Sequence, residues 1–319
     1  APTGFKNSYK ITPDATNTPT GGGNVTIRHQ IEGQDLQDLN YGTSSAKSLT
    51  ISFYAKTASE NSGDQYTLCL FYARQDSTQK TVTVAFTPTS TYQRFSFTFA
   101  GDTDASYGMR NDNGTGITAI WVLAAGPDDI KAAKSTWEVD GGYFRGVTGQ
   151  DNFMDNTSNE FYLTGVQLEV GNVATDFEHR SFAVEKGLCE RYYQRGRLRS
   201  YVLVGAPGTY YFSRGNIPLF TPMRASITGT LNAASSVSNR YFAFKTWADQ
   251  TNVTTAPGSV SFSSRVGDGG DGPHTDVISV DISATISSGS SNSPLPANGP
   301  GANNVYPIEY YDVELDAEL

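Results

Sequence analysis

An alternation of apolar and polar residues constrains the fold of this chain more than any other feature. Between residues 48 and 55 every second residue is apolar, and this set is Leu49, Ile51, Phe53 and Ala55. The same period returns in Val82, Val84 and Phe86, and again in Phe95, Phe97 and Phe99. Because successive side chains of a strand point to opposite faces, the pattern predicts strands with one buried face.

Two further segments, residues 66–72 and 119–124, are continuously apolar. Such runs predict strands buried on both faces and place Trp121 in the core. Turn signals at residues 61–64, 111–114 and 140–142 separate the runs, which gives about eight or nine strands before residue 171. This count predicts a β-sandwich over residues 1–179.

The composition supports an all-β chain and excludes some partners. Of 319 residues, 17% are charged and 12% are aromatic, a balance that suits pleated surfaces, and the length allows two domains. The net charge of −9 argues against binding to nucleic acid or to anionic membranes. No apolar run approaches the roughly 18 to 20 residues of a membrane span.

Residues 180–199 depart from the β pattern and predict a helical linker. Six basic residues stand there against Glu185 and Glu190, which gives an excess of four positive charges in an acidic protein. The helix is interpreted either as a solvated linker or as a contact helix between subunits. In the second case the candidate interface residues are Phe182, Cys189, Tyr192 and Tyr193.

The β pattern resumes after residue 200 and predicts a second, smaller β-sandwich domain over residues 200–319. Apolar alternation marks predicted strands at 201–204, 210–212, 225–231, 241–244, 260–262, 280–286 and 311–315. Residues 287–303 form a polar Ser, Gly, Asn and Pro stretch that predicts an exposed loop.

The residues that carry metal or acid–base chemistry are scattered. His29, His179 and His274 lie far apart, and Cys69 and Cys189 share no ligand spacing, so no metal or catalytic site is predicted and both thiols are expected to be buried. Pairs of acids are expected by chance among 32 acidic residues and are not evidence for an enzyme. The acidic loops at 102–104, 128–129 and 268–271 leave structural calcium open as an alternative to solvated loops.

Aromatic residues near predicted loops are the candidates for ligand contact. Sugars pack their apolar C–H faces on flat aromatic rings, while polar groups fix their orientation. The candidates are Tyr107, Trp137, Tyr143, Phe144 and Trp247. Each has the competing interpretation of a core residue.

Two segments carry a resemblance to a known family. Residues 163–181, LTGVQLEVGNVATDFEHRS, followed by CERYY at 189–193, resemble a segment of tail fibre and receptor-binding proteins of tailed bacteriophages, including marine and cyanobacterial ones. Shorter pieces at residues 4–8, 30–36, 47–56 and 155–159 agree with it. The resemblance covers about residues 4–195 and implies a jelly roll like that of carbohydrate-binding modules, expected over residues 1–179. The helical linker over 180–199 would then lead to a C-terminal β tip domain over 200–319, which matches the family only loosely.

The function implied by this resemblance is that of a non-enzymatic adhesin. It would be made in the host cytoplasm, belong to the virion tail fibre and bind host surface polysaccharide or lipopolysaccharide as a homotrimer, without a cofactor. A segment before residue 4 that the family usually carries is absent, so attachment to other tail proteins is expected through a missing N-terminal region. Host contact is expected, by analogy, on the domain after residue 200. The alternatives are a head fibre or decoration protein and a polysaccharide depolymerase, the latter disfavoured because β-helix repeats are absent.

Overall fold

The computed structural model shows an all-β chain that divides into two compact units, Ala1–His179 and Arg180–Glu318. The structure describes residues 1–139 and 145–204 together with seven later strands, and the side chains up to residue 194. The boundary at His179 falls at the predicted end of the first domain.

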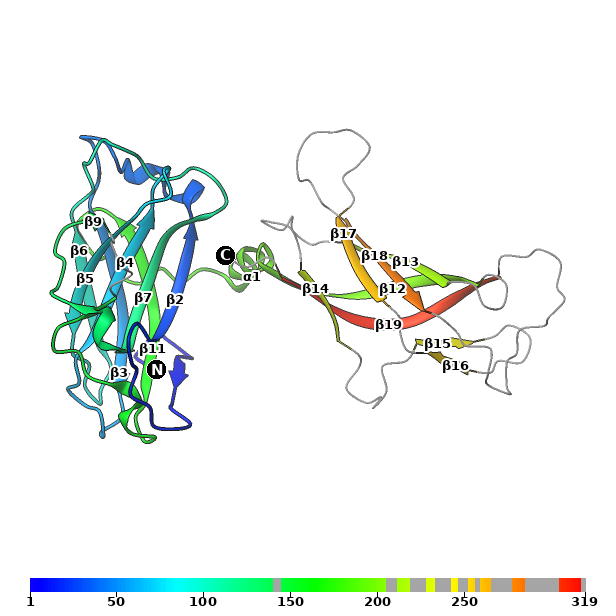
Figure 1. The fold of residues 1–319 in the computed structure, drawn as a ribbon, viewed down its shortest axis with the longest axis horizontal. Coiled ribbons are helices and arrows are strands. Elements are labelled where there is room, and N and C mark those ends of the chain that lie inside the picture. The colour runs from blue at the N-terminus through cyan, green and yellow to red at the C-terminus, as the bar shows by residue number, and fades with distance from the viewer. Residues whose placement is uncertain are drawn as a thin grey trace. The chain divides into compact units, whose positions relative to one another are not determined.

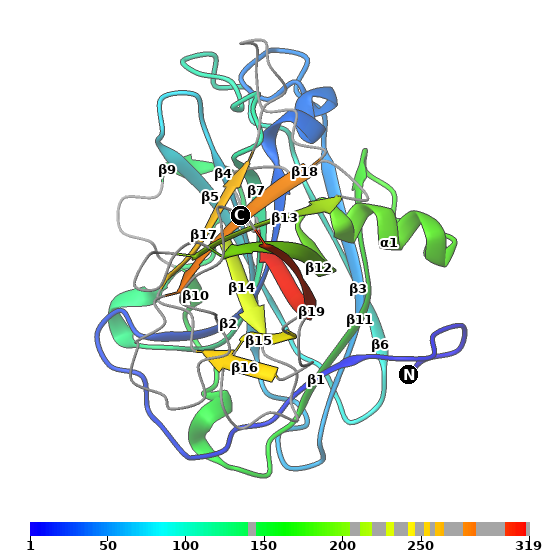
Figure 2. The same cartoon turned by 90° about the vertical axis from the view of Figure 1, so that its right-hand side faces the viewer.

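Two antiparallel sheets build the first unit, and their strands run side by side in Figure 1. The four-stranded sheet has the order β1 (Tyr9–Ile11), β11 (Phe161–Val170), β3 (Leu49–Thr57) and β6 (Gln93–Phe99). The five-stranded sheet has the order β2 (Asn24–Glu32), β7 (Thr115–Ala125), β4 (Tyr66–Ala73), β5 (Gln79–Phe86) and β9 (Glu138–Val139). In Figure 2, β11, β3 and β6 lie next to one another, as their register requires.

The core lies between these two sheets and is rich in aromatic residues. Phe53 of β3 meets Trp121 of β7 edge to face, with ring centroids 5.5 Å apart. The predicted inward residues of β3 are all buried, and Trp121 is a core residue as expected. Edge-to-face packing of large rings contributes beyond the area that it removes from water.

The outer face of the five-stranded sheet is also buried around β4. Cys69 and Phe71 of β4 form a second apolar cluster with Ile120 and Val122 of β7. The pair β8 (Ile130–Lys131) and β10 (Gly146–Val147) belongs to the segment that follows β7, and β10 contacts β4, β5 and β7. Every residue of β4 is buried, which confirms the prediction for residues 66–72.

A strap formed by residues 172–179 lies along the outer side of β11. The side chains of β11 bond its backbone, with Glu178 N donating to Gln167 Oε1 at 2.7 Å and Thr175 N donating to Glu169 Oε2 at 3.2 Å. Arg94 of β6 donates to the carbonyl of Thr175. The strap is therefore held by hydrogen bonds from side chains and not by strand pairing. Because it covers this face of the sheet, Thr50 and Ser52 of β3 are buried although they point away from the core.

Phe5 fastens the N-terminal segment to this strap. Its ring centroid lies 5.0 Å from that of Phe177, 5.3 Å from that of His179 and 5.3 Å from that of Tyr54. Gly165, at a register shift of β11, has φ +59°, and a Cβ there would lie 2.7 Å from Phe5 Cζ. The segments at residues 4–8 and 163–181, far apart in the sequence, thus form one contact.

Short 3-10 helices complete the first unit. They are η1 (Gly33–Leu39), which follows β2, η2 (Pro127–Asp129), which follows β7, and η3 (Phe153–Asp155), which precedes β11. Leu36 and Leu39 of η1 and Phe153 of η3 are buried against the sandwich core, so these turns close its ends.

The second unit contains a short helix and a six-stranded antiparallel sheet. The helix is α1 (Phe182–Glu190), and the sheet has the order β14, β19, β12, β13, β18, β17, with β15 and β16 forming a separate pair. The strands are β12 (Tyr193–Val204), β13 (Tyr211–Pro218), β14 (Thr228–Asn232), β15 (Phe242–Lys245), β16 (Asn252–Thr255), β17 (Ser259–Ser264), β18 (Val277–Ala284) and β19 (Asn304–Asp316). Every strand predicted after residue 200 overlaps one of them, and β16 was not predicted.

The helix predicted over residues 180–199 is wrong in its second half. The α-helix ends at Glu190, and β12 begins at Tyr193 and pairs with β19 through Val204. Arg195, Arg197 and Arg199 recur with a period of two, which is the period of a strand. Pairing with β19 from Tyr193 onward, joined by pairing with β13 from Arg199, places this segment in the sheet.

We expect Gly165→Ala to destabilise the first unit more than Gly171→Ala. Both glycines have positive φ, but a Cβ at Gly171 meets nothing within 4 Å, whereas one at Gly165 would displace Phe5. Left-handed strain costs about 1–2 kcal/mol at either site, and the clash adds about 1–3 kcal/mol at Gly165 alone. Urea unfolding monitored by tryptophan fluorescence measures both, and equal losses would show that Phe5 does not depend on Gly165.

Candidate functional site

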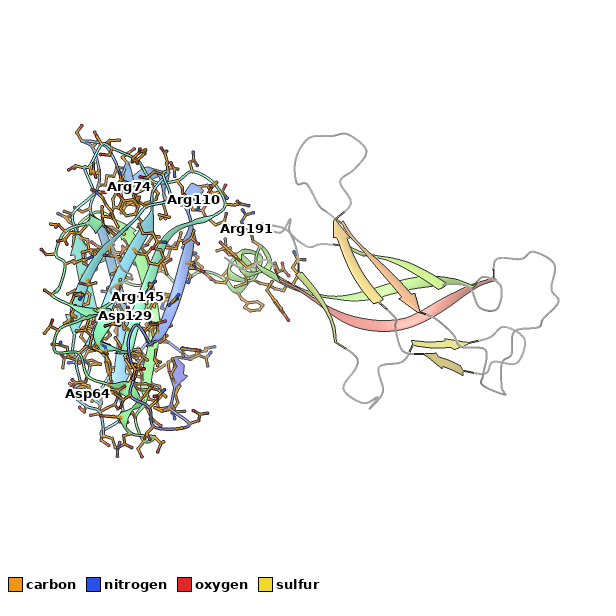
Figure 3. All side chains as sticks on the ribbon, viewed as in Figure 1. Asp64, Arg74, Arg110, Asp129, Arg145 and Arg191 are labelled. Atoms are coloured by element: carbon orange, nitrogen blue, oxygen red, sulfur yellow. The ribbon has the colours of Figure 1, made fainter. Side chains whose placement is uncertain are left out.

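The candidate site lies at the end of the first unit where the β4–β5 hairpin meets the loop between β6 and β7. Figure 3 shows Arg74 and Arg110 toward this end, with Asp64 at the opposite end. Arg74 follows β4 and bridges to Met109 of the loop. The loop supplies Asp102, Asp104 and Tyr107, so the site joins residues from two distant parts of the sequence.

A buried ion pair forms the base of the site. Lys80, on the core-facing side of β5, donates through Nζ to both oxygens of Asp102, at 2.9 and 2.8 Å. Tyr72 of β4 also donates to Asp102 Oδ2. Burial, followed by this hydrogen bond, raises the pKa of Tyr72, so the phenol stays protonated and keeps donating. A buried charge pair of this kind needs such additional hydrogen bonds, and here it fixes the start of the loop.

Asp104 and Arg74 form the next layer toward solvent. Asp104 Oδ2 lies 2.9 Å from Lys80 Nζ and 3.5 Å from Arg74 Nη1. Arg74 is buried, and its Nε, 3.8 Å from Asp76 Oδ1, has no hydrogen-bond partner. The hydrogen bond from Lys80, then that from Ser106, holds the pKa of Asp104 well below its ordinary value. Asp104 is therefore ionised at neutral pH.

Tyr107 is the exposed aromatic residue of the site. Its ring is covered by Arg74, whose guanidinium carbon lies 5.0 Å from the ring centroid, while 47% of the residue remains exposed. A cation over one face holds the ring in place. The arrangement presents a positioned aromatic surface next to two carboxylates.

Trp137 lies beneath this site rather than on its surface. It is buried, its Nε1 donates to the carbonyl of Ala100 at 2.9 Å, and its ring packs edge to face against Tyr41 and Tyr72. The interpretation of Trp137 as a ligand contact is therefore not supported, because the indole serves the core. Tyr143, Phe144 and Trp247 lie outside the described residues.

The acidic loops offer a further test of the calcium alternative. In the loop at 102–104, Lys80 already supplies the positive charge that both carboxylates face. At 128–129, Asp129 accepts a hydrogen bond from Asn24 Nδ2 at 2.7 Å. Within the part of the chain that the structure describes, no group of three or more metal-ligating side chains is found. The loop at 268–271 lies outside that part.

The predicted interface residues lie on or just after α1. Phe182 is 82% exposed, Cys189 and Tyr193 are exposed, and Tyr192 is half-buried. The expectation of a buried thiol holds for Cys69 and is wrong for Cys189. Val184 and Leu188 are exposed as well, and α1 contains no buried residue. A nine-residue helix with this surface has nothing apolar to pack on within the described part of its own chain.

Sequence reasoning identified Tyr107 but missed Lys80, Arg74 and Asp76. A signal for Lys80 was present, because extending the alternation of Val82, Val84 and Phe86 backward places Lys80 on the inward face. A lysine at a core position predicts a buried carboxylate partner. Arg74 could not be found this way, since it follows the end of a strand.

Comparisons with protein-family models, with curated proteins and with solved structures gave no match. No helix among the described residues is long and apolar enough to span a membrane.

We expect acid to destabilise the first unit partly through Asp104. Its pKa is lower in the folded chain than its ordinary value of 3.8, so its contribution is fully present above that pH and is lost as the pH falls toward the folded pKa. Asp104→Asn should lower Tm at pH 7 and reduce the further loss between pH 5 and pH 2.5. Asp35→Asn, an exposed acid on η1, is the control, and parallel pH profiles for Asp104→Asn and the wild type would contradict the assignment.

Proposed function

We propose that this chain is a non-enzymatic adhesin of a bacteriophage tail fibre that binds a host surface glycan as a trimer. The observation that carries the proposal is Tyr107, a half-exposed ring fixed by a buried arginine beside ionised carboxylates. Sugars bind through such pairs of an aromatic face and polar groups. The assignment to phage fibres is supported by the resemblance at residues 163–181.

The strand order supports a jelly roll as the fold of the first unit. The sheets β1-β11-β3-β6 and β2-β7-β4-β5 are antiparallel, and from β1 to β7 consecutive strands alternate between them except at the β4–β5 hairpin. A jelly roll consists of two four-stranded sheets built from two Greek keys, and this order has that connectivity. We therefore assign residues 1–179 to a jelly roll of the kind found in carbohydrate-binding modules, with β9 added at one edge.

The contact of Phe5 with the strap also supports the family assignment. The pieces at residues 4–8 and 163–181 carry the resemblance, and Phe5, Gly165 and Phe177 bring them together on one face. Two segments that pack against each other are expected to occur together in the proteins of one family. Residues 200–319 are assigned to a distal tip domain by analogy, and Trp247 is its ligand candidate.

The surface of α1 supports self-association. Phe182 and Cys189 lie on one side of the helix and Val184 and Leu188 on another, since each residue advances by about 100°. In a trimer, contacts with the neighbouring copies would cover these exposed apolar side chains. Isolated helices shorter than about 12–15 residues are marginal in water, so α1 needs such contacts. Three linked copies also raise avidity for a weak sugar site.

A head fibre or decoration protein is the second candidate function. The same exposed apolar surface of α1 favours it, because assembly with other virion proteins would cover these residues equally well. Locating the chain in an intact particle by labelling with a specific antibody separates the two functions.

We expect the double substitution Phe182→Glu and Leu188→Glu to convert the trimer into a monomer. The measured mass of the protein should fall from that of three chains to that of one. Charges on both sides of α1 oppose its burial between copies. Light scattering after size exclusion at micromolar concentration measures the mass. Val173→Glu, which alters an exposed valine outside the helix, is the control and should leave the trimer intact. A wild-type monomer would contradict the trimer.

We expect Tyr107→Ala to weaken binding to glycans by about tenfold per site, which corresponds to about 1.4 kcal/mol. A printed glycan array followed by surface plasmon resonance on the strongest glycan measures the loss. Tyr9→Ala removes another exposed ring of the first unit and should have no effect. If Trp247→Ala abolishes binding and Tyr107→Ala does not, the site belongs to residues 200–319.

A further inference from the structure

We infer that the Tyr107 site takes a neutral sugar through adjacent hydroxyl groups and rejects acidic sugars, an inference that rests on the proposed function. It concerns the ligand class of the surface formed by Tyr107, Asp104 and Asp76.

The polar groups that this surface offers to a ligand are acceptors. The side chains of Asp104 and Asp76 are 40% and 21% exposed, whereas those of Arg74 and Lys80 are 6% and 5% exposed. The two cations are therefore far less accessible to a ligand than the carboxylates. A ligand that approaches from solvent meets carboxylate oxygens and one aromatic ring.

Both carboxylates keep unused acceptor capacity. Asp104 Oδ2 receives Lys80 at 2.9 Å, and its Oδ1 receives the backbone N–H of Ser106 at 3.1 Å. Asp76 Oδ1 receives the backbone N–H and the hydroxyl of Thr78, at 3.0 and 2.7 Å. An ionised carboxylate has about four lone-pair sites, so oxygens remain for hydrogen bonds donated by hydroxyl groups.

Arg74 contacts both the ring of Tyr107 and the carboxylate of Asp104, so these two groups lie near each other. One guanidinium, that of Arg74, lies 5.0 Å from the Tyr107 centroid and 3.5 Å from Asp104 Oδ2. A pyranose can therefore place its C–H face on the ring while its neighbouring hydroxyls donate to the acid. Arg74 occupies one side of the ring, so one side is left for stacking.

The charge balance disfavours an acidic ligand. Asp76, Asp102 and Asp104 surround only two cations, Arg74 and Lys80, and the whole chain has a net charge of −9. A uronate, sialate or phosphate on the sugar would meet like charge at the exposed rim. Neutral hexoses and N-acetylhexosamines carry no such penalty.

The experiment uses the full chain and a glycan array that contains neutral and acidic oligosaccharides in matched backbones. We expect binding to neutral glycans only, at physiological ionic strength. Tyr107→Ala should lower that binding about tenfold. In Asp76→Asn the amide oxygen retains the hydrogen bonds from Thr78. This substitution should weaken binding to neutral glycans about threefold and reduce the difference in affinity between neutral and acidic glycans.

The outcomes separate this inference from the proposed function. Binding to acidic glycans that Tyr107→Ala abolishes would overturn the ligand class and leave the adhesin in place. If Tyr107→Ala still binds glycans as the wild type does, the assignment of the binding site to Tyr107 would be overturned. A chain that binds no glycan, although circular dichroism shows it folded, would overturn both.

Discussion

The burial of β4 on both faces is the constraint on which the first unit depends. Its inward side chains fill the space between the two sheets, and its outward ones, such as Cys69 and Phe71, form an apolar patch that water would otherwise meet. The chain after β7 therefore has to return over this patch, which is why β10 contacts β4, β5 and β7. The same return carries Trp137 into the core, where it supports Tyr41 and Tyr72. Covering one central strand thus positions the base of the candidate site.

The candidate site depends on a charged residue at a core-facing position of a strand. Lys80 occupies an inward position of β5, and a lysine there must find a charge partner or leave the core. Asp102 meets it, and this contact holds the loop that carries Asp104 and Tyr107 against the end of the sandwich. A surface loop acquires a fixed geometry because Asp102, near its start, completes a buried ion pair. Binding residues on loops gain precision from this kind of rigid support.

Much of the fold could be predicted because its signals are local. The alternation around Phe53 and the apolar run of β4 gave strands with the correct faces, and strands after residue 200 were found in the same way. The end of α1 could not be predicted, because β12 is stabilised by β19, which lies more than one hundred residues later. Of the site, Tyr107 was accessible as a loop aromatic. The role of Arg74 and the burial of Trp137 could not be predicted. Both depend on contacts between segments that are distant in the sequence, and no periodic pattern of residues signals such contacts.

The strap and α1 are neighbours in the sequence but differ in how many contacts hold them. Residues 172–179 are tied to β11 by Gln167 and Glu169 and to Phe5 by aromatic contacts, so they are specified by the first unit alone. Immediately afterwards α1 presents Phe182 and Leu188 to solvent and contains no buried residue. Among the described residues, a segment held by many contacts is thus followed directly by a helix whose apolar side chains are uncovered. In the trimer that we propose, the other copies would cover this helix, and the same assembly would multiply a glycan site that is weak when single.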